Sequence, residues 1–137
     1  MEIQFPIEFI VEGTPVSAQA ARAETREAWK ARVRSASLVV VPSPHFVSED
    51  PMFVTLYYLP DDSMQGDIDN IVKLVLDALC KLVYVDDHQV ERVVVQKFEP
   101  GKVFKFGQPS RTLELALNTE KPVLYVRVSN DPFEELT

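Results

Sequence analysis

An apolar stripe between residues 68 and 79 constrains the fold more than any other feature of this sequence. Its members recur at the spacing of one face of an α-helix: Ile68, Val72, Val75, Leu76 and Leu79. Such a face is normally buried against other elements of the protein. The stretch ahead of it, Met52–Leu59, is rich in β-branched and aromatic residues and predicts a strand. We therefore expect a buried helix over about residues 70–80 that follows a strand.

Weaker patterns predict the remaining elements of the fold. A helix is expected over about residues 17–37, with Ser17 as its cap. Further strands are expected at residues 5–12, 90–98, 112–117 and 123–128. This order of strands and two helices predicts a mixed-sheet α/β or α+β fold. With 137 residues the chain fits a single domain, 1–137, in which residues 119–137 look like a C-terminal extension.

The composition excludes several classes of protein. The chain is 46% hydrophobic and 26% charged, which is close to globular averages and argues against disorder. No apolar run reaches the roughly 18 residues of a membrane helix, and the first residues do not resemble a signal peptide. One cysteine, Cys80, cannot form an internal disulfide and fits better as a packed side chain than as a nucleophile. We expect a soluble cytoplasmic protein with no membrane partner.

Charge is distributed unevenly along the chain. The net charge is −7, which is the wrong sign for a protein that binds nucleic acid passively. Two stretches, residues 17–48 and 97–111, nevertheless each carry a net charge of +3. Their basic residues are candidate contacts to nucleic-acid phosphates: Arg22, Arg26, Lys30, Arg32 and Arg34 in the first stretch, and Lys97, Lys102, Lys105 and Arg111 in the second.

Asp67 and Asp69 are two residues apart, just before the predicted helix. If the chain enters that helix in an extended conformation, both carboxylates point to the same side. Two such charges repel by about 1 kcal/mol or more, depending on the local dielectric, and a divalent cation removes the repulsion. Ligands that are all oxygen suit Mg²⁺ or Mn²⁺. Helix capping is the equally weighted alternative for these two acids.

A second acidic pair, Asp86-Asp87, could complete such a site. Eleven helical residues carry the chain about 16 Å away from Asp69, and six extended residues can return it by roughly 20 Å. The pair therefore reaches the start of the helix only if the chain reverses near Cys80-Lys81. Without that reversal a third acid would have to come from another subunit, and an ordinary turn is the alternative role for Asp86-Asp87.

Lys73 lies four residues after Asp69 and four before Asp77, on one helix face. It is either part of a solvated salt-bridge ladder or a cation that stabilises charge developing on a phosphate. His88 could act as a base, since histidine titrates near neutral pH. His45 is the other histidine, so the sequence has no histidine cluster for zinc.

These motifs together resemble one known family. The pattern Gly-Asp-Ile-Asp-Asn-x-x-Lys-x-x-x-Asp-Ala-Leu over residues 66–79, followed by Asp-Asp-His-Gln-Val over residues 86–90, resembles the signature of the RusA family of Holliday junction resolvases. The likeness is strongest over about residues 66–98. It implies a small homodimeric, Mg²⁺-dependent endonuclease that nicks symmetric strands of four-way DNA junctions.

The resemblance also assigns roles to individual residues. Asp67 and Asp69 match the first two metal-binding acids of the family, and Asp87 matches the third, with Asp86 as its neighbour. Lys73 matches the lysine associated with catalysis. Under this interpretation the two basic stretches contact branched DNA on either side of the metal site.

Two other interpretations are compatible with the acidic net charge and the glutamates between the N-terminal arginines. The chain could be a catalytically idle relative that binds nucleic acid or protein. It could also be a metal-dependent nuclease that acts on other branched DNA or on ordinary duplexes, because recognition depends on dimer geometry rather than on motif residues.

Overall fold

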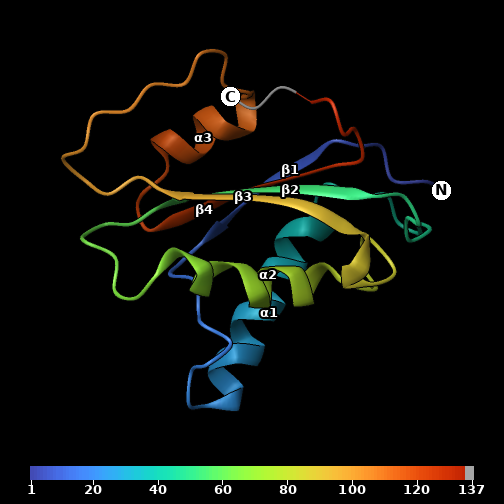
Figure 1. Cartoon of the computed structure of the whole chain (residues 1–137), viewed down its shortest axis with the longest axis horizontal. Coiled ribbons are helices and arrows are strands. Elements are labelled where there is room, and N and C mark those ends of the chain that lie inside the picture. Colours follow the sequence, from blue (N-terminus) through green and yellow to red (C-terminus); the bar gives the residue numbers. More distant parts are fainter. Residues whose placement is uncertain (135–137) are drawn as a thin grey trace.

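A four-stranded mixed sheet forms the centre of the computed structural model, which describes residues 1–134 (Figure 1). The strands lie in the order β1-β4-β2-β3. The neighbours β1 and β4 are antiparallel, as are β4 and β2, whereas β2 and β3 are parallel. Their bounds are Ile7–Glu12 for β1, Met52–Leu59 for β2, Val90–Lys97 for β3 and Val123–Ser129 for β4.

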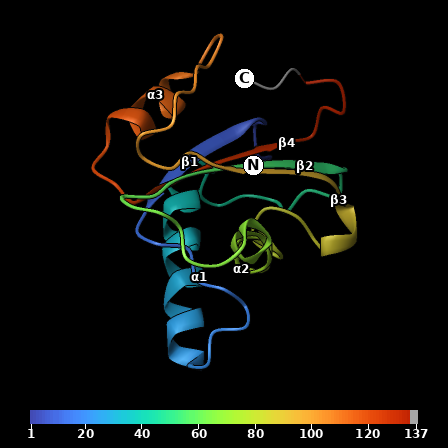
Figure 2. The ribbon, with the colours of Figure 1, turned by 60° about the vertical axis from the view of Figure 1, so that its left-hand side comes forward.

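Helices cover both faces of this sheet. Two of them, α1 (Ala23–Leu38) and α2 (Val72–Leu79), lie on one face, and α3 (Arg111–Asn118) lies on the other (Figures 1 and 2). Two short 3₁₀ helices, η1 (Ile68–Ile71) and η2 (Asp87–Gln89), precede α2 and β3. The predicted mixed-sheet α+β fold is thereby confirmed.

The core is divided by the sheet, and β2 supplies side chains to both halves. Val54, Leu56 and Tyr58 pack on the face covered by α1 and α2, while Tyr57 and Leu59 pack on the face covered by α3. Every residue of β2 is buried. This burial explains why its sequence, apart from Thr55, is apolar throughout instead of alternating, since a strand covered on both sides has no solvent face.

The strand expected at residues 112–117 is wrong, because this segment is helix α3, and residues 1–134 contain three α-helices instead of the expected two. Ser110 caps the helix, its side chain accepting a hydrogen bond from the backbone N–H of Leu113 at 3.1 Å. Leu113 and Ala116, three residues apart, are the buried residues of this helix. Leu115, by contrast, is 55% exposed.

Residues 119–134 are an integral part of the fold and not an extension of it. They contain β4, which lies between β1 and β2 in the sheet and pairs with both. Four consecutive residues of β4, starting at Val123, are buried. The last three residues of the expected extension, 135–137, lie outside the described part of the chain.

The first helix begins at Ala23, six residues later than expected. Ser17 forms a turn, in which its side chain accepts from the backbone N–H of Gln19 at 3.0 Å and its carbonyl from that of Ala20 at 3.0 Å. Within residues 1–134, no helix is long and apolar enough to cross a membrane.

Candidate active site

The topology of the sheet brings two segments with candidate functional residues to the same edge, the one formed by the carboxyl ends of β2 and β3. Because β2 and β3 are parallel, their carboxyl ends lie together, and Tyr58 pairs with Lys97 there. From this edge the chain leaves β2 toward the acidic residues before α2, and leaves β3 into the basic loop of residues 98–110. The carboxylate of Glu99 accepts a hydrogen bond from the backbone N–H of Met64 at 2.9 Å and ties the two segments together.

Asp67 and Asp69 are exposed carboxylates at the start of η1. Asp67 occupies the N-cap position with an extended backbone, but its side chain makes no capping hydrogen bond. The backbone N–H of Asn70 donates to the Asp67 carbonyl instead, at 3.1 Å. Within residues 1–134 neither carboxylate makes a hydrogen bond or an ion pair, so side-chain capping does not explain this pair of acids.

Gly66 sets the direction in which the chain enters the acidic pair. Its φ of +83° lies in the left-handed region, which side chains disfavour, and an added Cβ would lie 3.3 Å from Nδ2 of Asn70. We predict that Gly66→Ala lowers the free energy of unfolding by about 1 kcal/mol or more. Urea unfolding measures this, with Gly107→Ala as the matched control, because an added Cβ there meets nothing within 4 Å. Equal stability of the two variants would contradict the prediction.

The chain reverses after α2 as the sequence required. Lys81 has a φ of +67°, its backbone N–H donates to the Tyr84 carbonyl at 2.6 Å, and Cys80 forms a β-bridge with Tyr84. Tyr84 is fully buried, and its hydroxyl donates to the Leu76 carbonyl at 2.8 Å and lies 3.3 Å from Oδ1 of Asp87. The reversal therefore returns Asp87 to the side of α2.

Lys73 connects Asp87 to α2. Its Nζ lies 2.9 Å from Oδ1 of Asp77 and 3.5 Å from Oδ2 of Asp87. The ladder with Asp77 is therefore real, and Lys73 reaches the third acid as well. The hydrogen bond and charge of Asp77, followed by the charge of Asp87, raise the pKa of Lys73, so it is a cation at neutral pH. Because Lys73 is 60% exposed, these pairs contribute little stability.

Asp86 has a different environment from its neighbour. Its carboxylate lies 2.6 Å from Nδ1 of His88, and this hydrogen bond holds the pKa of Asp86 below its usual value. Asp86 is also the N-cap of η2, in a capping box with Gln89. His88 is 77% exposed, with Asp86 as its partner. The acidic pair thus divides into Asp87, which faces Lys73, and Asp86, which faces His88.

The chemistry of these side chains suits a hard divalent cation, although they are not gathered into one metal-binding group. Carboxylate oxygens are the ligands that Mg²⁺ and Mn²⁺ prefer, and Asp67 and Asp69 have both carboxylates exposed. In the described residues, no three His, Cys, Asp or Glu side chains lie close enough to hold a metal. Asp87 is paired with Lys73 instead.

Most basic residues of the first stretch have partners within α1 or next to it. Arg22 pairs with Glu24 at 3.1 Å and Lys30 with Glu27 at 2.9 Å. Two others donate to backbone carbonyls, Arg26 to that of Ala20 and Arg34 to that of Ala78, the latter at 3.2 Å.

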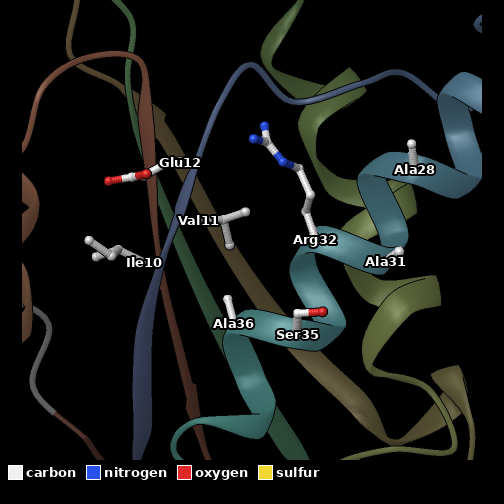
Figure 3. Close-up of a pocket in the computed structure, with 8 residues that line it drawn as sticks. All are labelled: Ile10, Val11, Glu12, Ala28, Ala31, Arg32, Ser35 and Ala36. Atoms are coloured by element: carbon white, nitrogen blue, oxygen red, sulfur yellow. The ribbon is translucent and has the colours of Figure 1, made fainter.

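Arg32 differs from these, since it lines a groove between β1 and α1. Figure 3 shows its guanidinium extending along this groove, whose helical wall consists of the small side chains of Ala28, Ala31 and Ser35. The guanidinium lies against the backbone of Gly13, where an added Cβ would be 2.3 Å from its Nη1.

The second basic stretch lies on the other face of the sheet. The loop of residues 98–110 runs on the side of α3, away from α1 and α2 (Figures 1 and 2). Its Phe98, Phe104 and Phe106 pack against one another, and two of them against Tyr57. Lys97 pairs with Glu99 at 3.2 Å. Lys102, Lys105 and Arg111 are exposed. The two basic stretches therefore do not both border the acidic residues on one face.

Sequence reasoning missed two residues that organise this region, Tyr84 and Gln89. The spacing Asp86-x-x-Gln89 is the signature of a capping box, so the involvement of Gln89 could have been found. The bond between Tyr84 and Asp87 had no comparable signal, because it depends on how the reversal folds.

Comparison with known protein families assigns the chain to one of them. The family model described as endodeoxyribonuclease RusA matches residues 14–105, more than half of the chain. The chain belongs to the RusA family. The match contains Asp67, Asp69, Lys73 and Asp87, and the RusA assignment supports nuclease activity on DNA. It ends before α3 and β4, which complete the fold outside the matched region. No curated protein matches the chain.

Proposed function

We propose that this protein is a Mg²⁺-dependent endonuclease that cleaves four-way DNA junctions during recombination and repair. One observation carries the proposal: Asp67 and Asp69, inside the RusA-family match, are exposed carboxylates that cap nothing. Neighbouring acids without a structural role are what a cation-binding site requires. Mn²⁺ is the alternative ion.

In this proposal Asp67 and Asp69 hold the metal, and Asp87 joins them. The ion would activate a water molecule and stabilise the leaving oxygen of the phosphodiester. Lys73, a cation at neutral pH, neutralises charge that develops on the phosphate. Because Asp87 faces Lys73 at 3.5 Å, its joining the metal site requires that it exchange this ion pair for the metal. Asp86, which faces His88, is at most an outer ligand.

The DNA partner that we propose is the four-way junction, bound by a homodimer. A two-fold symmetric dimer presents two sites, which fits the symmetry of such a junction. The contacts that we assign to phosphates are Arg32 on the face of α1, and Lys102, Lys105 and Arg111 beyond β3. Since these residues lie on both faces of the sheet, DNA would cross the edge where β2 and β3 end.

We predict weak junction binding in chelator and tighter binding in Ca²⁺. Carboxylates beside the scissile phosphate repel it until a cation is bound between them. Ca²⁺ can occupy the place of Mg²⁺ among these carboxylates, but we expect it not to support cleavage. Electrophoretic mobility-shift titration of a labelled four-way junction measures both affinities near physiological salt. Replacing Ca²⁺ with Mg²⁺ should then produce nicks. Binding without nicking would favour the catalytically idle module, to which the net charge of −7 also points.

The role of the basic loop is tested in the same titration. The double substitution Lys102→Ala and Lys105→Ala should make the negative slope of log affinity against log salt shallower by about 2, since each phosphate contact contributes about −0.9. Arg22→Ala with Lys30→Ala removes the same number of cations, but these are already paired with Glu24 and Glu27. This comparison variant should keep a slope closer to that of the wild type. A larger loss in the comparison variant would assign DNA binding to α1.

A further inference from the structure

Gln89 is a buried polar residue that the proposed chemistry leaves unused. It ends η2 and is 7% exposed. Its Oε1 accepts hydrogen bonds from the backbone N–H groups of Val85 at 2.7 Å and Asp86 at 2.9 Å. Its Nε2 donates to the backbone carbonyls of Ser48 and Asp50, each at 2.9 Å. A side-chain amide offers two donor hydrogens and an acceptor oxygen with two lone pairs, so Gln89 uses its whole capacity.

These four bonds join the turn that carries the second acidic pair to the loop that leads into β2. The chain just before this turn is linked to the same loop by the backbone N–H of Ser48, which donates to the Val83 carbonyl at 2.9 Å. His45 adds a second link, its Nε2 lying 2.8 Å from the Leu82 carbonyl. Gln89 bonds to both segments and uses all of its polar atoms to do so. No apolar or charged side chain of similar size can reproduce two donors beside one doubly used acceptor.

Apart from the Gln89 side chain, the turn at residues 85–88 is tied to the rest of the chain by Asp87 itself and by a 3.5 Å hydrogen bond from Cys80 Sγ to the Val85 carbonyl. Val85 is 42% exposed, and Asp86 and His88 are exposed as well. Asp87 nevertheless has to reach Lys73 at 3.5 Å and Tyr84 at 3.3 Å. Distances of this kind are lost when the backbone moves by about an ångström, and such a shift can lower a catalysed rate by about 100-fold.

We propose that Gln89 is a positioning residue for the metal-dependent cleavage, because it fixes the backbone before Asp87 and so keeps the Asp87 carboxylate on the side of α2, where it can exchange Lys73 for the metal. The proposal rests on the proposed function. Gln89 itself contacts neither metal nor DNA in it, and acts through Asp87.

The test uses two substitutions at this position and one matched control. Gln89→Met keeps the approximate volume and removes all four hydrogen bonds. Gln89→Glu keeps the acceptor for Val85 and Asp86, but places an oxygen against the carbonyls of Ser48 and Asp50. Gln96→Met makes the same chemical change at an exposed position of β3.

We expect Gln89→Met to lower the maximal cleavage rate by about 10- to 100-fold. It should also raise the Mg²⁺ concentration for half-maximal cleavage and remove the tightening of junction binding by Ca²⁺. Binding in chelator should stay at the wild-type level, because Gln89 does not contact DNA. Gln89→Glu should show the same changes, because it turns a donor into an oxygen that repels the carbonyls of Ser48 and Asp50, and Gln96→Met should show none.

Wild-type Mg²⁺ dependence and Ca²⁺ response in folded Gln89 variants would overturn the positioning role. A lowered melting temperature without any change in metal response would also overturn it, since that is a purely structural effect. If Gln89→Met does not fold, Gln89→Glu decides by the same two measurements. A wild-type protein that shows no metal-dependent cleavage refutes the proposed function itself, and the role of Gln89 with it.

Discussion

Asp67→Asn and Asp69→Asn are each expected to lower Mg²⁺-dependent cleavage of a four-way junction by about 1,000-fold or more. A metal ion supplies several kcal/mol of transition-state stabilisation, and each 1.36 kcal/mol corresponds to a tenfold change in rate. Removing one ligand charge weakens the site for that ion. Cleavage of a labelled junction over a range of Mg²⁺ concentrations measures the loss.

The fold should survive both substitutions, because neither carboxylate has a structural partner within residues 1–134. Relief of repulsion between the two charges should leave the melting temperature unchanged or slightly raised. Asp61→Asn is the matched control, since it removes an exposed carboxylate from the same connection without touching the pair. Full activity in either variant would refute the metal site, and unfolding of either would restore the capping interpretation.

Asp87→Asn is expected to lose far more activity than Asp86→Asn. Asp87 faces Lys73 and Tyr84, and the neutral amide removes its charge from the proposed site. We predict a loss of about 100-fold or more, the scale of removing one electrostatic contact from an active site. Parallel kinetics of the two variants at saturating Mg²⁺ measure the difference.

Asp86→Asn should stay within severalfold of the wild type. Asparagine is as good an N-cap as aspartate, so η2 keeps its cap, and only the pairing with His88 is lost. Since that pair is exposed, its contribution to stability is small. Equal tolerance of both substitutions would mean that Asp87 is not the third acid of the site.

Local patterns predicted the parts of the fold that depend on local burial. The apolar stripe of residues 68–79 and the apolar run of residues 52–59 were sufficient to predict α2 and β2. Each pattern shows directly which side chains must be buried. The same reasoning wrongly predicted a strand at residues 112–117, since the leucines there fit a strand as well as a helix. The cap by Ser110 favours α3, and serine just before residue 111 is a typical sequence signal for the start of a helix.

The candidate site was only partly predictable, because its geometry depends on how segments distant in the sequence pack together. The spacing identified the acids and the required reversal, and the structure contains that reversal at Lys81. Which of two adjacent acids turns toward Lys73 depends on the geometry of η2, which the sequence does not specify. The placement of the basic loop on the face of α3 likewise follows from the packing of Phe98 and Phe106 beside Tyr57.

The central claim, that this is a metal-dependent nuclease specific for junctions, is tested most directly by mapping cleavage strand by strand. A four-way junction labelled on each strand in turn, and a linear duplex of the same sequence, are incubated with the wild-type protein in Mg²⁺ and in chelator. We predict paired nicks in two opposing strands of the junction, only in Mg²⁺, and an intact duplex. Equal cleavage of the duplex, or cleavage that persists in chelator, would contradict the claim.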